Sequence, residues 1–210
     1  MRKETLWEEM KRRNPGHSAW YIQRFEQMRA EGADLHGEAR LVDAMVPRGS
    51  RILDAGCGPG RLGGELARRG HSVVGVDIDP ELIDAARKDH PDCTWLVGDL
   101  AELDLPAQGI AEPFDVIVSA GNVLTFLAPG TSAEVLRNLA GHLAPAGRLV
   151  TGFGAGRGYD FDEFFSDAAA AGLTPDLRLA TWDLRPFTPS SDFLVAIFSK
   201  TEGQQQPGPA

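Results

Sequence analysis

The segment from Arg51 to Gly60, R-I-L-D-A-G-C-G-P-G, constrains the fold of this 210-residue chain more than any other. Its apolar start ends in an acid, Asp54, and three glycines then alternate before an amphipathic stretch over residues 62–69. The pattern predicts a buried strand, a tight glycine turn and the start of a helix. Free N–H groups at a helix start, next to glycines, let a ligand approach the main chain. The acid does not suit a pyrophosphate and favours a ligand with positive charge or hydrogen-bond donors.

The alternation of strand and helix continues along the chain and predicts an α/β fold with a doubly wound, mostly parallel sheet. Two strand-like runs at the end, 177–184 and 193–199, have no helix between them, which predicts an antiparallel hairpin at the sheet edge. Before these runs we expect strands over 51–54, 72–77, 94–98, 114–119 and 148–153, helices over 61–69, 80–90, 132–143 and 160–171, and a turn at 145–147.

The segment before this alternation, residues 1–47, is expected to form three helices. They cover about 1–13, 18–31 and 36–46, and Ser18 is a plausible N-cap of the second. Residues 48–200 then form the α/β domain. The last residues, 201–210, are polar and rich in Gly and Pro, which predicts disorder.

The composition excludes several classes of function. The net charge of −9 opposes non-specific nucleic-acid binding. Because no apolar run is long enough for a membrane span and the N-terminus lacks an apolar signal core, we expect a cytoplasmic protein without membrane partners. Two cysteines are too few for a zinc site, and the five histidines show no metal-ligand spacing. The sequence leaves a monomer and a homodimer both open.

Acids also end the second and third strands. Asp77 is placed to accept hydrogen bonds from ribose hydroxyls, although a capping or turn role is the alternative. Asp99 is placed to accept a bond from an adenine amino group, or is a simple loop acid. Ligands of open α/β sheets bind at the carboxyl ends of the strands, where Asp54 also lies. Three acids at one edge therefore predict a single binding site.

Four other side chains are candidates for this site. Asn122 follows the fourth strand and is either a site residue or a helix cap. Tyr21 and Arg24 share one side of the second helix, where Arg24 either binds a ligand carboxylate or is solvated. His17 is retained because its segment can fold over the site.

Together these motifs resemble those of the class I S-adenosylmethionine-dependent methyltransferases. The resemblance covers about Ser18 to Lys200: D-A-G-C-G-P-G resembles the family's glycine motif, V-V-G-V-D-I-D its second strand, G-D-L its adenine-binding acid, and L-A-P-A-G-R-L-V its turn into strand five. It implies a seven-stranded Rossmann-like methyltransferase fold with an antiparallel last strand, and S-adenosylmethionine as cofactor. The helices of 1–47 are then expected to cap the cofactor site.

The resemblance also implies roles for single residues. Asp54 would anchor the methionine amino group, directly or through water, Asp77 the ribose, and Asp99 the adenine amino group. The remaining cofactor-binding residues implied or proposed are Tyr21, Arg24, Gly56, Cys57, Gly58, Gly60, Ile78, Leu100, Ala120 and Gly121, although Cys57 is also explained by the small space within the turn.

The methyl acceptor is less clearly marked. The N-P-P-Y motif of many base and protein-amide methylases is replaced by S-A-G-N, which favours a small-molecule acceptor. No general base stands out, and Asn122, His17 and Tyr159 are candidates. Two alternatives remain: a non-catalytic S-adenosylmethionine-binding protein, and an NAD(P)-dependent oxidoreductase suggested by G-P-G-R-L-G from Gly58.

Overall fold

A seven-stranded sheet forms the centre of the molecule in the computed structural model, which describes residues 2–201. The strand order is β3-β2-β1-β4-β5-β7-β6, and only the pairs that include β7 are antiparallel. The predicted fold class is therefore confirmed. The strands are β1 (Arg51–Ala55), β2 (Ser72–Asp77), β3 (Thr94–Val97), β4 (Phe114–Ser119), β5 (Leu143–Gly154), β6 (Leu173–Leu179) and β7 (Phe193–Lys200).

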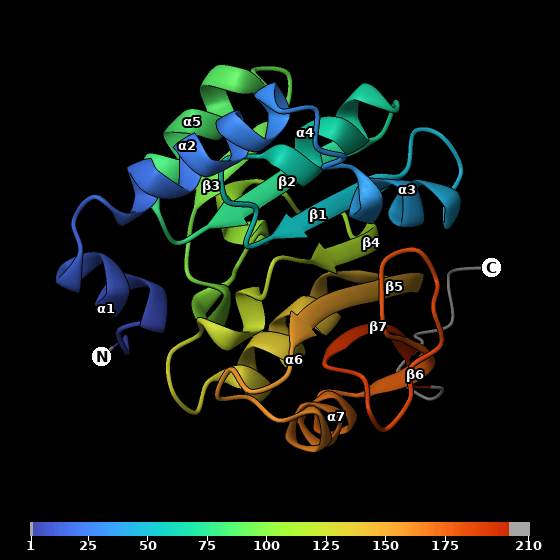
Figure 1. Ribbon diagram of the computed structural model, residues 1–210. Coiled ribbons are helices and arrows are strands. Elements are labelled where there is room, and N and C mark those ends of the chain that lie inside the picture. The colour runs from blue at the N-terminus through green and yellow to red at the C-terminus, as the bar shows by residue number, and fades with distance from the viewer. Residues whose placement is uncertain (1, 202–210) are drawn as a thin grey trace.

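Helices cover both faces of this sheet (Figure 1). Helices α3, α4 and α5 pack on one face, and α6 and α7 on the other. Each face buries its own apolar cluster, as expected for a doubly wound sheet whose crossovers change sides where the strand order reverses, between β1 and β4. The α-helices are α1 (Leu6–Arg13), α2 (His17–Ala30), α3 (Gly37–Ala44), α4 (Arg61–Arg68), α5 (Pro80–Asp89), α6 (Ser132–His142) and α7 (Phe161–Ala170), with short 3₁₀ turns η1 (Leu100–Glu102), η2 (Pro106–Gln108) and η3 (Val123–Thr125).

Two elements differ from the sequence-based expectation. The expected turn at 145–147 is part of β5, which begins at Leu143 and passes a bulge opposite β4. A Cβ on Gly147 would lie 2.7 Å from the Phe114 carbonyl oxygen, so glycine is what permits this close passage. The sixth strand begins four residues earlier than predicted, because Leu173 pairs with Lys200, and it ends at Leu179 rather than at residue 184. Of the expected disordered tail, all but Thr201 lies outside the described residues.

Helix α2 begins one residue earlier than predicted, and Ser18 is not its N-cap. Gly16 occupies the cap position, and Ser18 is fully buried within the first turn. Its hydroxyl donates a hydrogen bond to Asp79, the N-cap of α5. Tertiary contact with a buried acid therefore explains a residue whose type alone suggested capping.

Asp79 holds both N-terminal helices against the sheet. Its carboxylate accepts hydrogen bonds from Trp7 Nε1 on α1 at 2.9 Å, from Lys11 Nζ at 2.5 Å and from Ser18. Backbone N–H groups of Leu6 and Trp7 also donate to the Phe126 carbonyl. These contacts fix α1 beyond the carboxyl ends of the strands, as Figure 1 shows.

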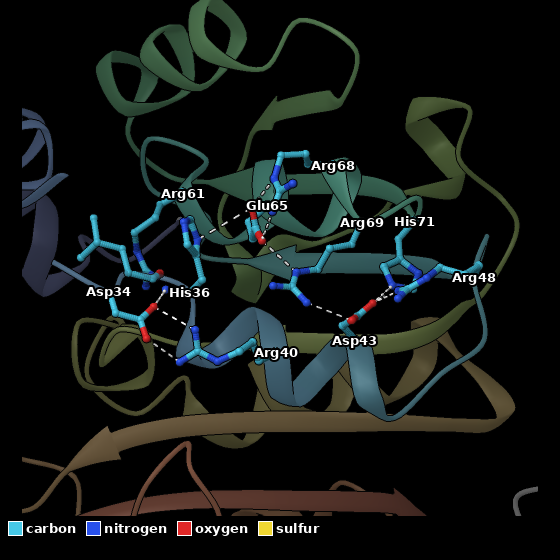
Figure 2. Close-up of polar contacts among 11 residues, drawn as sticks. Asp34, His36, Arg40, Asp43, Arg48, Arg61, Glu65, Arg68, Arg69 and His71 are labelled. Atoms are coloured by element: carbon cyan, nitrogen blue, oxygen red, sulfur yellow. Dashed lines mark hydrogen bonds and ion pairs between the residues drawn. The ribbon is translucent and has the colours of Figure 1, made fainter. Parts of the chain in front are cut away.

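A network of charges joins α3 to α4 (Figure 2). Glu65 on α4 accepts hydrogen bonds from Arg68 and Arg69, and Arg69 also binds Asp43 on α3 at 3.0 Å. The other Asp43 oxygen lies 3.0 Å from Nε2 of the buried His71 and also contacts Arg48. This network fixes α3 relative to α4, whose first residue faces the carboxyl edge of the sheet.

Candidate functional site

A cavity of about 610 Å³ opens at the carboxyl edge of the sheet, where β1, β2 and β4 end. Its floor comes from the turns after these strands, and its roof from α1, α2 and the segment before α3. The volume falls within the usual range of small-molecule sites. Of the residues singled out from the sequence, the cavity is lined by His17, Tyr21, Arg24, Gly56, Gly58, Asp77, Ile78, Asp99, Leu100, Ala120, Gly121 and Asn122.

The glycine turn after β1 divides between site and core. Gly56, Gly58 and Gly60 all have positive φ, which glycine adopts without strain. Gly56 and Gly58 line the cavity, whereas a Cβ on Gly60 would meet Ala86 at 2.9 Å on the opposite side. Cys57 is buried with α5, and burial raises the pKa of its thiol. Gly60 and Cys57 were both expected to bind cofactor. In the structure they pack the glycine turn against α5 and do not line the cavity.

Asp54 lies below the glycine turn and does not line the cavity. One oxygen accepts the backbone N–H of Gly63, in the first turn of α4, at 2.9 Å. Burial raises the pKa of Asp54 to about 7, against the lowering effect of that hydrogen bond. The Asp54 carboxylate therefore joins the end of β1 to the first turn of α4. It does not line the cavity, so it makes no direct contact with a ligand bound there.

Asp77 lines the cavity and orients the glycine turn. Its two oxygens accept the backbone N–H of Gly58 at 2.8 Å and that of Asp79 at 2.9 Å. Burial raises the pKa of Asp77 to about 6, and the two N–H groups oppose the rise. Each carboxylate oxygen has a further lone pair, so Asp77 can still accept bonds from hydroxyl groups. Ile78 follows it along the wall.

Asp99 lines the far end of the cavity but already has partners. Arg2 Nη1 donates to one oxygen at 3.0 Å, and the backbone N–H of Ala101 donates to the other at 2.9 Å. Asp99 is thus the N-cap of η1, and Leu100 after it packs into the core. Asp99 is therefore a loop acid that also lines the cavity, and its contact with an adenine amino group stays a prediction.

Asn122 is held in a left-handed conformation at the end of β4, with φ of 67°. Its Oδ1 accepts the backbone N–H of Gly154 at 2.9 Å, which ties this loop to the end of β5. Asn122 also occupies the N-cap position of η3, where its backbone carbonyl accepts the N–H of Thr125, but its side chain makes no capping bond. Ala120 and Gly121 precede it along the same wall.

Helix α2 forms the roof of the cavity. A Cβ on Gly58 would lie 3.6 Å from the Tyr21 ring, and one on Gly121 would lie 3.9 Å from its hydroxyl. Tyr21 therefore spans both glycine turns, and burial raises its pKa. Arg24 lies over the ring of Trp20 at 5.8 Å, and His17 stacks on the same ring.

Tyr159 does not belong to this cavity. Its hydroxyl donates to Asp167 at 2.8 Å, its ring stacks on Phe153, and it lines a separate cavity of about 310 Å³. Burial, reinforced by Asp167, raises the pKa of Tyr159 well above its usual range. Tyr159, a candidate base from the sequence, therefore lies outside the main cavity and packs in the core.

Several lining residues gave no clear sequence signal. Arg61 forms a two-pronged ion pair with Glu38 at 2.7 and 3.1 Å and also binds the Leu35 carbonyl. Arg61 directly follows the glycine motif, which is the signal that could have drawn attention to it. Others from the roof and the β4 and β5 loops are Trp7, Met10, Phe25, Val123, Phe126 and Arg157.

Comparison with known proteins identifies the family and its fold. A model of the methyltransferase domain matches residues 52–147, from β1 into β5. The structure of a TehB-like SAM-dependent methyltransferase from Corynebacterium glutamicum superposes with a TM-score of 0.84 and 50% identity, over 90% of this chain and 100% of that one. The chain belongs to the class I S-adenosylmethionine-dependent methyltransferases.

Curated relatives of this methyltransferase match over part of their length. An uncharacterised methyltransferase of Mycobacterium tuberculosis is 34% identical over 72% of this chain and 66% of its own length. Magnesium-protoporphyrin O-methyltransferase of Rhodobacter capsulatus is 42% identical over 43% of this chain, which covers 39% of that protein. Ribosomal protein L11 methyltransferases also match, so family membership does not determine the acceptor.

Two further observations concern the described residues of the methyltransferase. Among residues 2–201, no helix is both long and apolar enough to span a membrane. The same residues contain no group of three or more His, Cys, Asp and Glu side chains arranged to hold a metal ion.

Proposed function

We propose that this methyltransferase transfers a methyl group from S-adenosylmethionine to a small-molecule acceptor. The observation that carries the proposal is the cavity itself. It joins the glycine turn, the Asp77 carboxylate and an apolar roof in one space of about 610 Å³. Because α1 and α2 cover the strand ends, these two helices of residues 1–47 act as a cap over the cofactor domain of residues 48–200, whereas α3 packs on one face of the sheet.

The residues present fit the cofactor. Asp77 accepts hydrogen bonds from the ribose hydroxyls, and Ile78 and Leu100 lie along the adenine. Asp99 receives the adenine amino group on a lone pair left free by Arg2 and Ala101. Gly58 and Gly121, which carry no side chain between backbone and cavity, lie along the methionine portion beneath Tyr21. Arg24 binds the methionine carboxylate.

Bound S-adenosylmethionine supplies an electrophilic methyl group, which forms a bond to the acceptor atom as its bond to sulfur breaks and a neutral thioether remains. The protein's own contribution is alignment and the exclusion of water. Tyr21, Trp7 and Phe126 close the roof with apolar rings.

An acceptor that is protonated at neutral pH also needs a group to take its proton. His17 is the imidazole that lines the cavity, and Asn122 can hold an acceptor by hydrogen bonding but cannot act as a base. We therefore propose His17 for the proton and Asn122 for positioning.

Calorimetry tests the cofactor, and label transfer tests the reaction. The full chain should bind S-adenosylmethionine and S-adenosylhomocysteine but not NADH. Transfer of labelled methyl to a small acceptor should follow. Tight binding of NADH with no response to either sulfur nucleoside would refute the proposal. Binding of both nucleosides without transfer to any acceptor would identify a non-catalytic binding protein instead.

A further inference from the structure

Most charged side chains that line the cavity are already paired. Glu38 is paired with Arg61, Asp34 with Arg40, and Asp99 with Arg2. Asp77 accepts two backbone N–H groups. Arg24 and Arg157 also line the cavity, yet neither takes part in an ion pair within residues 2–201. The cavity therefore offers two uncommitted guanidinium groups.

The two arginines belong to different parts of the site. Arg24 is on α2, one turn after Tyr21, which lies over the glycine turns. Arg157 is in the loop between β5 and α7. There its Nε would lie 3.2 Å from a Cβ on Gly154, whose N–H is bound by Asn122. Arg157 thus stands next to the end of the cavity where the positioning residue Asn122 lies.

S-adenosylmethionine has a single carboxylate, for which Arg24 is the partner. A second guanidinium beside Asn122 is left without an anion. The protein has a net charge of −9, so an arginine without an ion-pair partner at the cavity mouth creates a local positive potential on a negatively charged molecule. Its planar group can donate two parallel hydrogen bonds to a carboxylate or phosphate.

The loop around Arg157 suits ligand capture. Gly156 and Gly158 flank it with φ of 70° and 85°, and a Cβ on either would meet nothing within 4 Å. The arginine is exposed, so its charge remains hydrated until an anion arrives at the mouth. We propose that the methyl acceptor carries a carboxylate or phosphate group and that Arg157 binds it, which orients the acceptor past Asn122. The proposal rests on the proposed function.

The test uses matched acceptors and two arginine variants. Aromatic carboxylic acids, aryl phosphate monoesters, and their uncharged amides and alcohols are offered with methyl-labelled S-adenosylmethionine. Transfer should be confined to the anions, and the two anionic series distinguish carboxylate from phosphate. Arg157→Gln should raise KM for the best anion by about 10- to 100-fold, as expected for a lost charged hydrogen bond, with kcat largely kept. Arg157→Lys should recover part of the loss.

Controls separate this inference from the proposed function. Arg157→Gln should leave S-adenosylhomocysteine affinity unchanged, whereas Arg24→Gln should weaken it. Arg137→Gln, at an exposed position on α6, should alter neither quantity. Equal transfer to charged and uncharged acceptors, no transfer to any anion, or an unaltered KM in Arg157→Gln would overturn the assignment. Failure of the wild-type chain to bind S-adenosylhomocysteine would instead refute the proposed function.

Discussion

Replacement of Asp79 by asparagine should release the two N-terminal helices from the α/β domain. The carboxylate is buried and accepts four hydrogen bonds. The donors are Trp7 Nε1, Lys11 Nζ, the Ser18 hydroxyl and the backbone N–H of Glu81. Asparagine preserves the shape but has one acceptor oxygen and an NH₂ group. At least one donor would then face another donor, and Lys11 would lose its counter-charge.

The magnitude follows from these contacts. Hydrogen bonds to a charged group contribute about 1.5–3 kcal/mol each, and breaking a buried ion pair from one side costs about 3–5 kcal/mol. Lys11 is 25% exposed, so water compensates part of its loss. We expect about 2–4 kcal/mol, or a roughly 30- to 700-fold increase in local opening of α1 and α2.

Hydrogen exchange measured by mass spectrometry checks this expectation. Peptides from α1 and α2 should lose protection in Asp79→Asn, while peptides from β1 and β4 keep theirs. Asp84→Asn is the matched control, because Asp84 is on the same helix with an exposed partner, Arg87. Wild-type protection of α1 in Asp79→Asn would show that the Asp79 contacts do not hold the helices. Burial opposes ionisation of Asp79, but the hydrogen bonds from Lys11, Ser18 and Trp7 hold its pKa below the usual range of an aspartate. The docking should therefore persist above about pH 4 and weaken as pH falls further.

Three other perturbations test the site. Asp77→Ala should weaken S-adenosylhomocysteine binding by about 1–3 kcal/mol in calorimetry, and wild-type affinity would argue against the ribose assignment. Asn122→Ala should lower turnover more than cofactor affinity in parallel kinetic and binding assays, and if both keep wild-type values Asn122 serves only the loop. The pKa of Asp54 is raised by burial to about 7, so the contribution of this carboxyl to folding stability is full below about pH 4 and declines as pH rises toward 7. Asp54→Asn should make that decline shallower by up to about 4 kcal/mol in urea titrations, and an unchanged pH profile would show that the buried carboxyl is not its source.

The α/β core could be predicted because its signals are local. Alternating apolar strands and amphipathic helices specify which faces are buried, and Pro80 and the glycine turn mark where elements begin. The predicted bounds of helices and strands were wrong where a residue far away in the chain determines where the element begins. Gly147 and Pro145 read as a turn in isolation, but pairing of β5 with β4 across a bulge draws them into the strand. The residue type of Ser18 predicts a helix cap, but its hydroxyl donates its hydrogen bond to the buried Asp79.

By itself the sequence determined the strand-end acids, the glycine turn and hence the edge of the sheet at which a ligand binds, because those features follow from residue type and order along one element. Tertiary structure alone decided which of them face the cavity. The side chains of Asp54 and Cys57 are buried, Gly60 packs against Ala86 and does not line the cavity, and Tyr159 is a core residue. It also brought Arg157 to the mouth of the cavity. These outcomes depend on side-chain direction and on contacts between segments far apart in the chain, which a linear pattern does not encode.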